Sequence, residues 1–106
     1  VLVFGAEGKF KTIFKHYFEQ WHLKRKEKKI KLKIIYNKKL KRNLPYSEIR
    51  VNKHLDKTPA TTMIYNDKTI IIVWSEQPLA TLIRSKEVAN SYKEIFKEMW
   101  RVAKKV

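Results

Sequence analysis

Apolar residues recur at intervals of three and four in two stretches of the chain, and this spacing predicts two helices. The first runs from Lys9 to Lys28, and the second follows Ser85, which is a favoured N-cap residue. Glu87 would then stand in the first turn, where the helix dipole favours an acid. The expected apolar stripes are Phe10, Ile13, Phe14, Tyr17, Phe18 and Trp21 in the first helix and Val88, Ala89, Tyr92, Ile95, Phe96, Met99, Trp100 and Ala103 in the second.

Short apolar runs outside these helices predict strands over residues 1–4, 30–36, 48–53, 61–65, 69–74 and 79–84. Alternation from Ile30 to Tyr36 predicts a strand with one buried face, and residues 48–53 read as a short edge strand. Asn66-Asp67 stands between two β-branched runs and predicts a tight hairpin turn, because both residues tolerate positive φ. The order is β-α-β-β-β-β-β-α.

This order predicts an α/β fold with a mixed sheet of about five to six strands and two main helices. A helix joins the first two strands, so they should be parallel with a right-handed connection. An antiparallel meander should follow, and the last helix should cover the sheet. A length of 106 residues fits a single domain over 1–106. Val1 already belongs to a strand-like run, so we expect this domain to be the C-terminal part of a longer protein.

Composition excludes several kinds of site. The chain has no cysteine, so it has no disulfide, iron–sulfur cluster or thiol nucleophile. No apolar run approaches the roughly 18–20 residues of a membrane span, and no signal peptide is visible. We therefore expect a cytoplasmic protein without a membrane partner.

The net charge is +15, from 25 basic and 10 acidic residues, and such an excess is typical of proteins with a polyanionic partner. Codon bias in an AT-rich genome, or an uneven share of charge in a fragment, would also produce it. The candidate nucleic-acid surface comprises Lys24, Arg25, Lys28, Lys29, Lys31, Lys33, Lys38, Lys39, Lys41 and Arg42. The alternative is a solvated helix end, strand face and loop, since Tyr36 is the only aromatic residue in this stretch and its alternation places it on the buried face.

The polar residues do not form a recognisable catalytic or metal centre. His16 and His22 are six residues apart on one predicted helix and so point in different directions. Gly5 and Gly8 are separated by two residues where a nucleotide-binding loop needs four, and Phe10 replaces the hydroxyl residue after Lys9. The acids are scattered without close pairs. We expect no enzyme activity, no metal and no cofactor.

Four segments together resemble the C-terminal effector region of TrmB-family archaeal transcriptional regulators. They are Thr61–Ala80 (TTMIYNDKTIIIVWSEQPLA), Lys86–Trp100 (KEVANSYKEIFKEMW), Gly5–Trp21 and Lys31–Asn37. The resemblance implies half of a phospholipase D-like fold. It also implies an upstream winged helix that binds DNA. Some members of the family add a sugar-binding domain after this region, and we expect none here because the sequence ends after its last helix.

The phospholipase motif, His-x-Lys followed after four residues by Asp, is missing from this scaffold. Alignment on the Asn66-Asp67 turn puts the histidine at Pro59 or Ala60 and the lysine at Thr61 or Thr62. Only Asp67 could stand for the acid, and it reads better as a turn residue. His54 also fails, because Asp56 occupies the lysine position. Without the imidazole there is no phosphohistidine route.

Two functions follow as hypotheses, with a degenerate phosphodiesterase as a third. The first is a non-catalytic regulatory and dimerisation domain, acting as a homodimer and able to sense a sugar-like effector. Its ligand would lie at the carboxyl edge of the parallel strands, near Glu7, Lys9, Asn37, Trp74, Ser75 and Glu76. Trp74 could stack on the ligand, or it could pack at the dimer contact. The second is direct nucleic-acid binding through residues 24–42.

Overall fold

The computed structural model describes residues 1–6, 23–36, 46–52, 60–73, 77 and 79–105. These residues form an α/β fold with a mixed sheet, as the sequence predicts. Residues 9–22 of the predicted first helix lie outside the described part of the chain, and residues 23–27 at its end are helical. The elements are β1 (Leu2–Ala6), a helical segment over residues 23–27, β2 (Leu32–Tyr36), β3 (Ser47–Val51), β4 (Ala60–Tyr65), β5 (Lys68–Val73), β6 (Leu79–Arg84), α3 (Lys86–Val102) and β7 (Lys104–Lys105).

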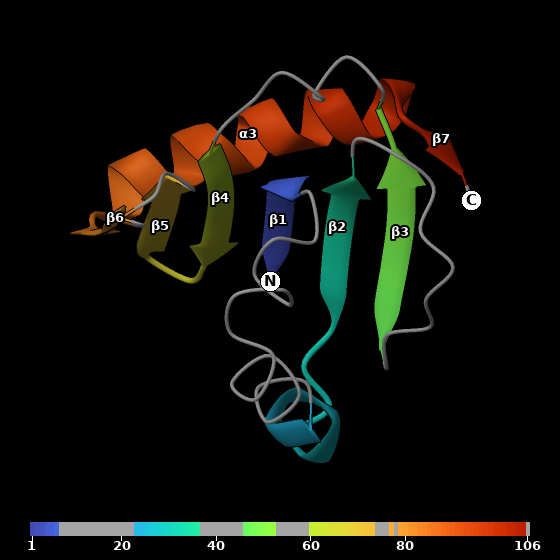
Figure 1. Ribbon diagram of the computed structural model, residues 1–106, viewed down its shortest axis with the longest axis horizontal. Helices are drawn as coiled ribbons and strands as arrows, with labels where there is room; N and C mark the ends of the chain where they lie inside the picture. The colour runs from blue at the N-terminus through green and yellow to red at the C-terminus, as the bar shows by residue number, and fades with distance from the viewer. Residues whose placement is uncertain (7–22, 37–45, 53–59, 74–76, 78, 106) are drawn as a thin grey trace.

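The strands form one sheet in the order β6-β5-β4-β1-β2-β3-β7 (Figure 1). β1, β2 and β3 are parallel neighbours, and β4, β5 and β6 form an antiparallel meander beside β1. The predicted parallel pair is confirmed, and so is the meander for β4, β5 and β6. β3 departs from the predicted meander, because it is parallel to β2. The prediction of β3 as an edge strand is wrong, because β7 pairs with it on its outer side. β7 is only two residues long, which is too short to produce a recognisable pattern in the sequence.

The hairpin between β4 and β5 turns at Asn66-Asp67, as predicted, with Tyr65 opposite Lys68. Asn66 adopts φ 54°, the left-handed conformation that asparagine tolerates better than most residues. The turn is held by its neighbours: the Ser85 amide donates to the Asp67 carbonyl at 2.9 Å, and Lys93 Nζ donates to the Asn66 carbonyl at 2.9 Å. The turn therefore fixes the start of α3 against the meander.

Ser85 is the N-cap of α3, and its Oγ accepts a hydrogen bond from the Val88 amide at 3.2 Å. The predicted cap and the acidic first turn at Glu87 are confirmed. Ala89 and Phe96 lie at the centre of the predicted apolar stripe and are buried. Ile95 departs from the prediction and is 50% exposed, because it stands about 100° around the helix from Phe96.

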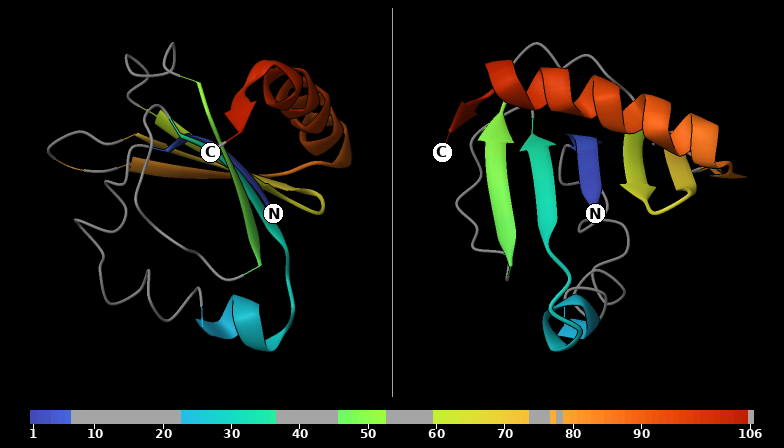
Figure 2. Two further views of the ribbon diagram at one scale, coloured as in Figure 1. Left: turned by 90° about the vertical axis from the view of Figure 1, so that its right-hand side faces the viewer. Right: turned by 180° about the vertical axis from the view of Figure 1, so that it is seen from behind.

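The sheet is apolar on both faces near its centre. On the face under α3, Ile35 and Ile64 pack with Ala89 and Phe96 of the helix. On the opposite face a second cluster contains Val3, Leu32, Ile34 and Tyr36. Figure 2 shows α3 on one side of the sheet and the helical residues 23–27 beyond the end where β2 begins. β2 is therefore buried on both faces, as is usual for a parallel strand inside a sheet, whereas its alternation had predicted one buried face.

The last turn of α3 is fastened to β2 and β3 through Trp100. Arg50 Nη1 donates to the Trp100 carbonyl at 2.6 Å, and its guanidinium carbon lies 4.4 Å from the centre of the indole ring. Lys33 Nζ lies 5.3 Å from the centre of the same ring. Cations are favoured both over an indole face and beside the carboxyl end of a helix. In the part of the chain that the structure describes, no helix is long and apolar enough to cross a membrane.

Candidate functional site

The ligand site expected at the carboxyl edge of the parallel strands lies outside the described residues. Its six members are Glu7, Lys9, Asn37, Trp74, Ser75 and Glu76. The described chain does show where this edge is, since Ala6 at the end of β1 is in register with Tyr36 at the end of β2. The two strands therefore end side by side, as the prediction required.

The predicted basic surface is divided by the structure. Lys24, Lys28, Lys29 and Lys31 are exposed around the end of the helical segment and the start of β2. Lys33 is instead on the α3 face of the sheet, over Trp100. Residues Lys38, Lys39, Lys41 and Arg42 lie outside the described part of the chain, as do His16, His22 and His54.

Arg25, in the middle of this basic stretch, is a buried structural residue with 2% of its surface exposed. Its Nη1 donates to the carbonyls of Ile30 at 2.9 Å and Tyr46 at 3.2 Å, and its Nη2 donates to Ser47 Oγ at 3.2 Å. Burial lowers the pKa of this guanidinium, which stays charged because an arginine titrates so far above neutral pH. Arg25 therefore joins the helix end to the starts of β2 and β3, and it does not belong to an exposed phosphate-binding surface.

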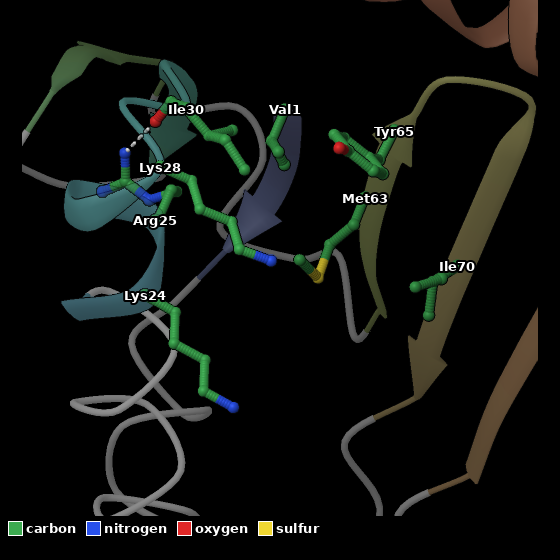
Figure 3. A pocket seen from close by; sticks show the side chains of 8 residues that line it. All are labelled: Val1, Lys24, Arg25, Lys28, Ile30, Met63, Tyr65 and Ile70. Atoms are coloured by element: carbon green, nitrogen blue, oxygen red, sulfur yellow. Dashed lines mark hydrogen bonds between the residues drawn. The ribbon is translucent and has the colours of Figure 1, made fainter.

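A cavity of about 320 Å³ opens between the helical segment and the meander (Figure 3). The described residues that line it are Val1, Lys24, Arg25, Lys28, Ile30, Met63, Tyr65 and Ile70. Val1 precedes β1 and Ile30 precedes β2, so the cavity lies at the amino ends of the parallel strands, away from the edge where the sequence placed a ligand. Its volume falls at the lower end of the range for small-molecule sites, roughly 300–1,000 Å³.

The cavity combines an apolar wall with positive charge. Met63 from β4 and Ile70 from β5 are directly opposite each other in the register and share one face of the sheet. Lys28 directly follows the helical residues 23–27, and its amide donates to the Lys24 carbonyl at 3.0 Å, so the two lysines are one turn apart on the same side of the segment. Figure 3 shows the Lys28 side chain extending toward Met63 and the Lys24 side chain lying below it, whereas the Arg25 guanidinium points toward the Ile30 carbonyl. The described lining contains no acid.

Sequence reasoning missed this cavity although part of its signal is visible. The spacing of Lys24 and Lys28 already places two cations on one helical face. Their position beside Met63 and Ile70 depends on β4 pairing with β1, a contact between segments about sixty residues apart in sequence. Periodicity describes each segment and does not indicate which segments become neighbours.

The search for a metal site and the comparison with known proteins give no further information about this cavity. Among the described residues, no group of three or more His, Asp or Glu side chains could hold a metal ion. No family model matches the chain, and searches of curated proteins and of solved structures also find no match.

Proposed function

We propose that this chain is a regulatory and dimerisation domain without a catalytic centre of its own. It acts as a homodimer in the cytoplasm and transmits a signal to an upstream DNA-binding domain. The resemblance to TrmB-type regulators supports the regulatory role and the phospholipase D-like relationship of the fold. The observation that carries the dimer is the open edge of the sheet at β6.

Among the residues that the structure describes, β6 pairs with β5 on one side only and forms one edge of the sheet. Leu79 is 64% exposed and Leu82 is 51% exposed. A six-residue edge strand with exposed leucines is a template for pairing with another strand, unless charges or a bulge prevent it. Arg84, at the end of the strand, is the only charge within it.

The backbone hydrogen bonds of β6 are arranged for pairing with a second copy. The Ser85 amide bonds to the directly opposite Asp67 carbonyl. Hydrogen-bonded and non-bonded pairs alternate in an antiparallel ladder, so Thr81 and Ile83 direct their amides and carbonyls at β5. The amides and carbonyls of Ala80, Leu82 and Arg84 point away from β5, toward the open edge of the sheet. If a two-fold axis passes through Leu82, the β6 strands of two copies run antiparallel. The outward amides of each copy then lie opposite the outward carbonyls of the other.

The side chains favour the same register. An apolar row crosses the sheet on the face away from α3, one residue from each of six neighbouring strands. In order from β3 to β6 the row is Ile49, Ile34, Val3, Met63, Ile70 and Leu82. Leu82 is the exposed end of this row, and pairing at Leu82 would continue it into the second copy. A second copy is therefore the partner whose chemistry fits this edge best.

Light scattering on the parent chain and on two variants tests whether the dimer forms and whether β6 forms its interface. The chain should be dimeric at micromolar concentration, and Leu82→Lys should be monomeric because it brings two ammonium groups together at the axis. Ile95→Lys is the matched control, since Ile95 is equally exposed but lies on α3. A monomeric parent chain, or dissociation by Ile95→Lys and not by Leu82→Lys, would contradict the proposal.

Direct nucleic-acid binding is the second candidate, favoured by the exposed lysines Lys24, Lys28, Lys29 and Lys31. Binding through these residues would weaken steeply with salt, with a logarithmic slope of about 0.9 for each phosphate neutralised. A titration with a duplex of arbitrary sequence at low and at moderate salt measures this slope. No binding at low salt would exclude this function.

A further inference from the structure

We propose that the cavity between the helical segment and the meander binds a carboxylate that carries an apolar tail, and that this ligand is the signal. The inference rests on the proposed regulatory function and names the ligand class for it. It differs from the sugar-like effector expected at the carboxyl edge of the strands.

The apolar part of the ligand is specified by the cavity walls. Val1, Ile30, Met63 and Ile70 present aliphatic or thioether groups, and Tyr65 adds a ring. A volume of about 320 Å³ corresponds to about ten water-sized groups. Among the described lining residues there is no carboxylate or carboxamide to hold sugar hydroxyl groups. A short hydrocarbon chain therefore fits this wall better than a polyol does.

The charged part of the ligand is specified by Lys24 and Lys28. Like charges four residues apart on a helix repel each other, and a carboxylate bound between these ammonium groups would relieve that repulsion. The segment that carries them is held in place by the hydrogen bonds from Arg25 to the Ile30 and Tyr46 carbonyls. The two cations therefore stand on a fixed support beside an apolar wall, which is the arrangement that an amphipathic anion requires.

The cavity is also connected to the proposed dimer edge. Ile70, in the cavity wall, is directly opposite Leu82 in the register of β5 and β6. They form a non-hydrogen-bonded pair, in which side chains approach most closely. A ligand that fixes Ile70 would thereby change the position of Leu82 at the two-fold axis. By thermodynamic linkage, the ligand would alter dimer affinity and dimerisation would alter ligand affinity by the same factor.

Octanoate is the probe that tests the ligand class. Titration calorimetry should show saturable binding, and the Met63 methyl signal in NMR spectra should shift on the same concentration scale. 1-Octanol, which has the same tail without the charge, should bind at least about fivefold more weakly.

Two lysine variants locate the charge. Lys28→Gln should weaken octanoate binding about fivefold, and the double variant Lys24→Gln/Lys28→Gln should weaken it further. Lys26→Gln is the matched control, since Lys26 is exposed on the same segment but does not line the cavity; its affinity should stay within about twofold of the parent. Circular dichroism verifies that each variant is folded.

The outcomes separate this inference from the proposed function. A dimeric chain that shows no saturable octanoate binding, or that binds octanoate and 1-octanol equally, overturns the inference and leaves the dimer intact. A monomeric chain that binds octanoate through Lys28 overturns the proposed dimer and supports the ligand site. An equal effect of Lys26→Gln and Lys28→Gln would show nonspecific attraction to a basic surface and would also overturn the inference.

Discussion

Replacement of Arg25 by methionine tests the structural role of this buried cation. Methionine retains much of the aliphatic length but donates no hydrogen bond. The Ile30 and Tyr46 carbonyls would lose the Nη1 donor, and Ser47 Oγ would lose Nη2. An unsatisfied buried carbonyl costs about 1–3 kcal/mol.

The expected loss follows from these three contacts. The Tyr46 carbonyl keeps the hydrogen bond that it accepts from the Leu32 amide at 2.9 Å, and water can partly replace the donor lost by the half-buried Ile30. Each lost hydrogen bond is therefore expected to cost about 0.5–1.5 kcal/mol, and not the full penalty of an unsatisfied carbonyl. The Ser47 hydroxyl can rotate to another partner. The free energy of unfolding should therefore fall by about 2–4 kcal/mol, a large part of the roughly 5–15 kcal/mol of a small domain.

Urea denaturation followed by circular dichroism measures this loss. With a slope of about 2 kcal/mol per molar urea, in the middle of the usual range, the midpoint should fall by about 1–2 M. Lys26→Met is the control, because Lys26 is the exposed neighbour and should change stability by less than about 0.5 kcal/mol. A loss below about 1 kcal/mol for Arg25→Met would show that the side chain holds nothing in place, and would return it to the candidate nucleic-acid surface.

Substitutions at three further positions test the fold, each by the same denaturation assay. Phe96→Ala should cost about 3–5 kcal/mol, because this side chain is 2% exposed between Phe4 and Trp100; a loss below 1 kcal/mol would mean that α3 does not pack as described. Ser85→Ala removes the hydroxyl that caps α3 and should cost about 0.5–2 kcal/mol, with Ser91→Ala as the exposed control within the helix; equal losses would argue against the cap. Asn66→Gly should be close to neutral and Asn66→Val should cost at least about 1–2 kcal/mol, because φ is 54° here; a neutral valine would contradict that turn.

The parts of the fold that could be predicted from the sequence are those determined by neighbouring residues. The Asn66-Asp67 turn needs a residue that tolerates positive φ between two β-branched runs, and both conditions are visible in a short window. The Ser85 cap is equally local, since its hydroxyl bonds an amide three residues away. The run from Leu79 to Arg84 was predicted with the bounds that β6 has.

Features that depend on distant contacts could not be predicted. Arg25 stands among other basic residues and has no local sign of burial, because its partners include Tyr46 and Ser47 some twenty residues away. Lys33 belongs to a basic run in the sequence, and only the position of Trp100 over the same face of the sheet separates it from the exposed lysines. The cavity requires β4 to lie between β1 and β5, and periodicity carries no information about that order.

Hydrogen exchange of the β6 amides tests the proposed dimer most directly. The amides of Thr81 and Ile83 face β5 and should be protected at every protein concentration. Those of Ala80, Leu82 and Arg84 face outward and should become protected as the concentration rises and the second copy pairs with them. Fast exchange of these three amides at all concentrations, or concentration-dependent protection confined to α3, would contradict a dimer formed through this edge.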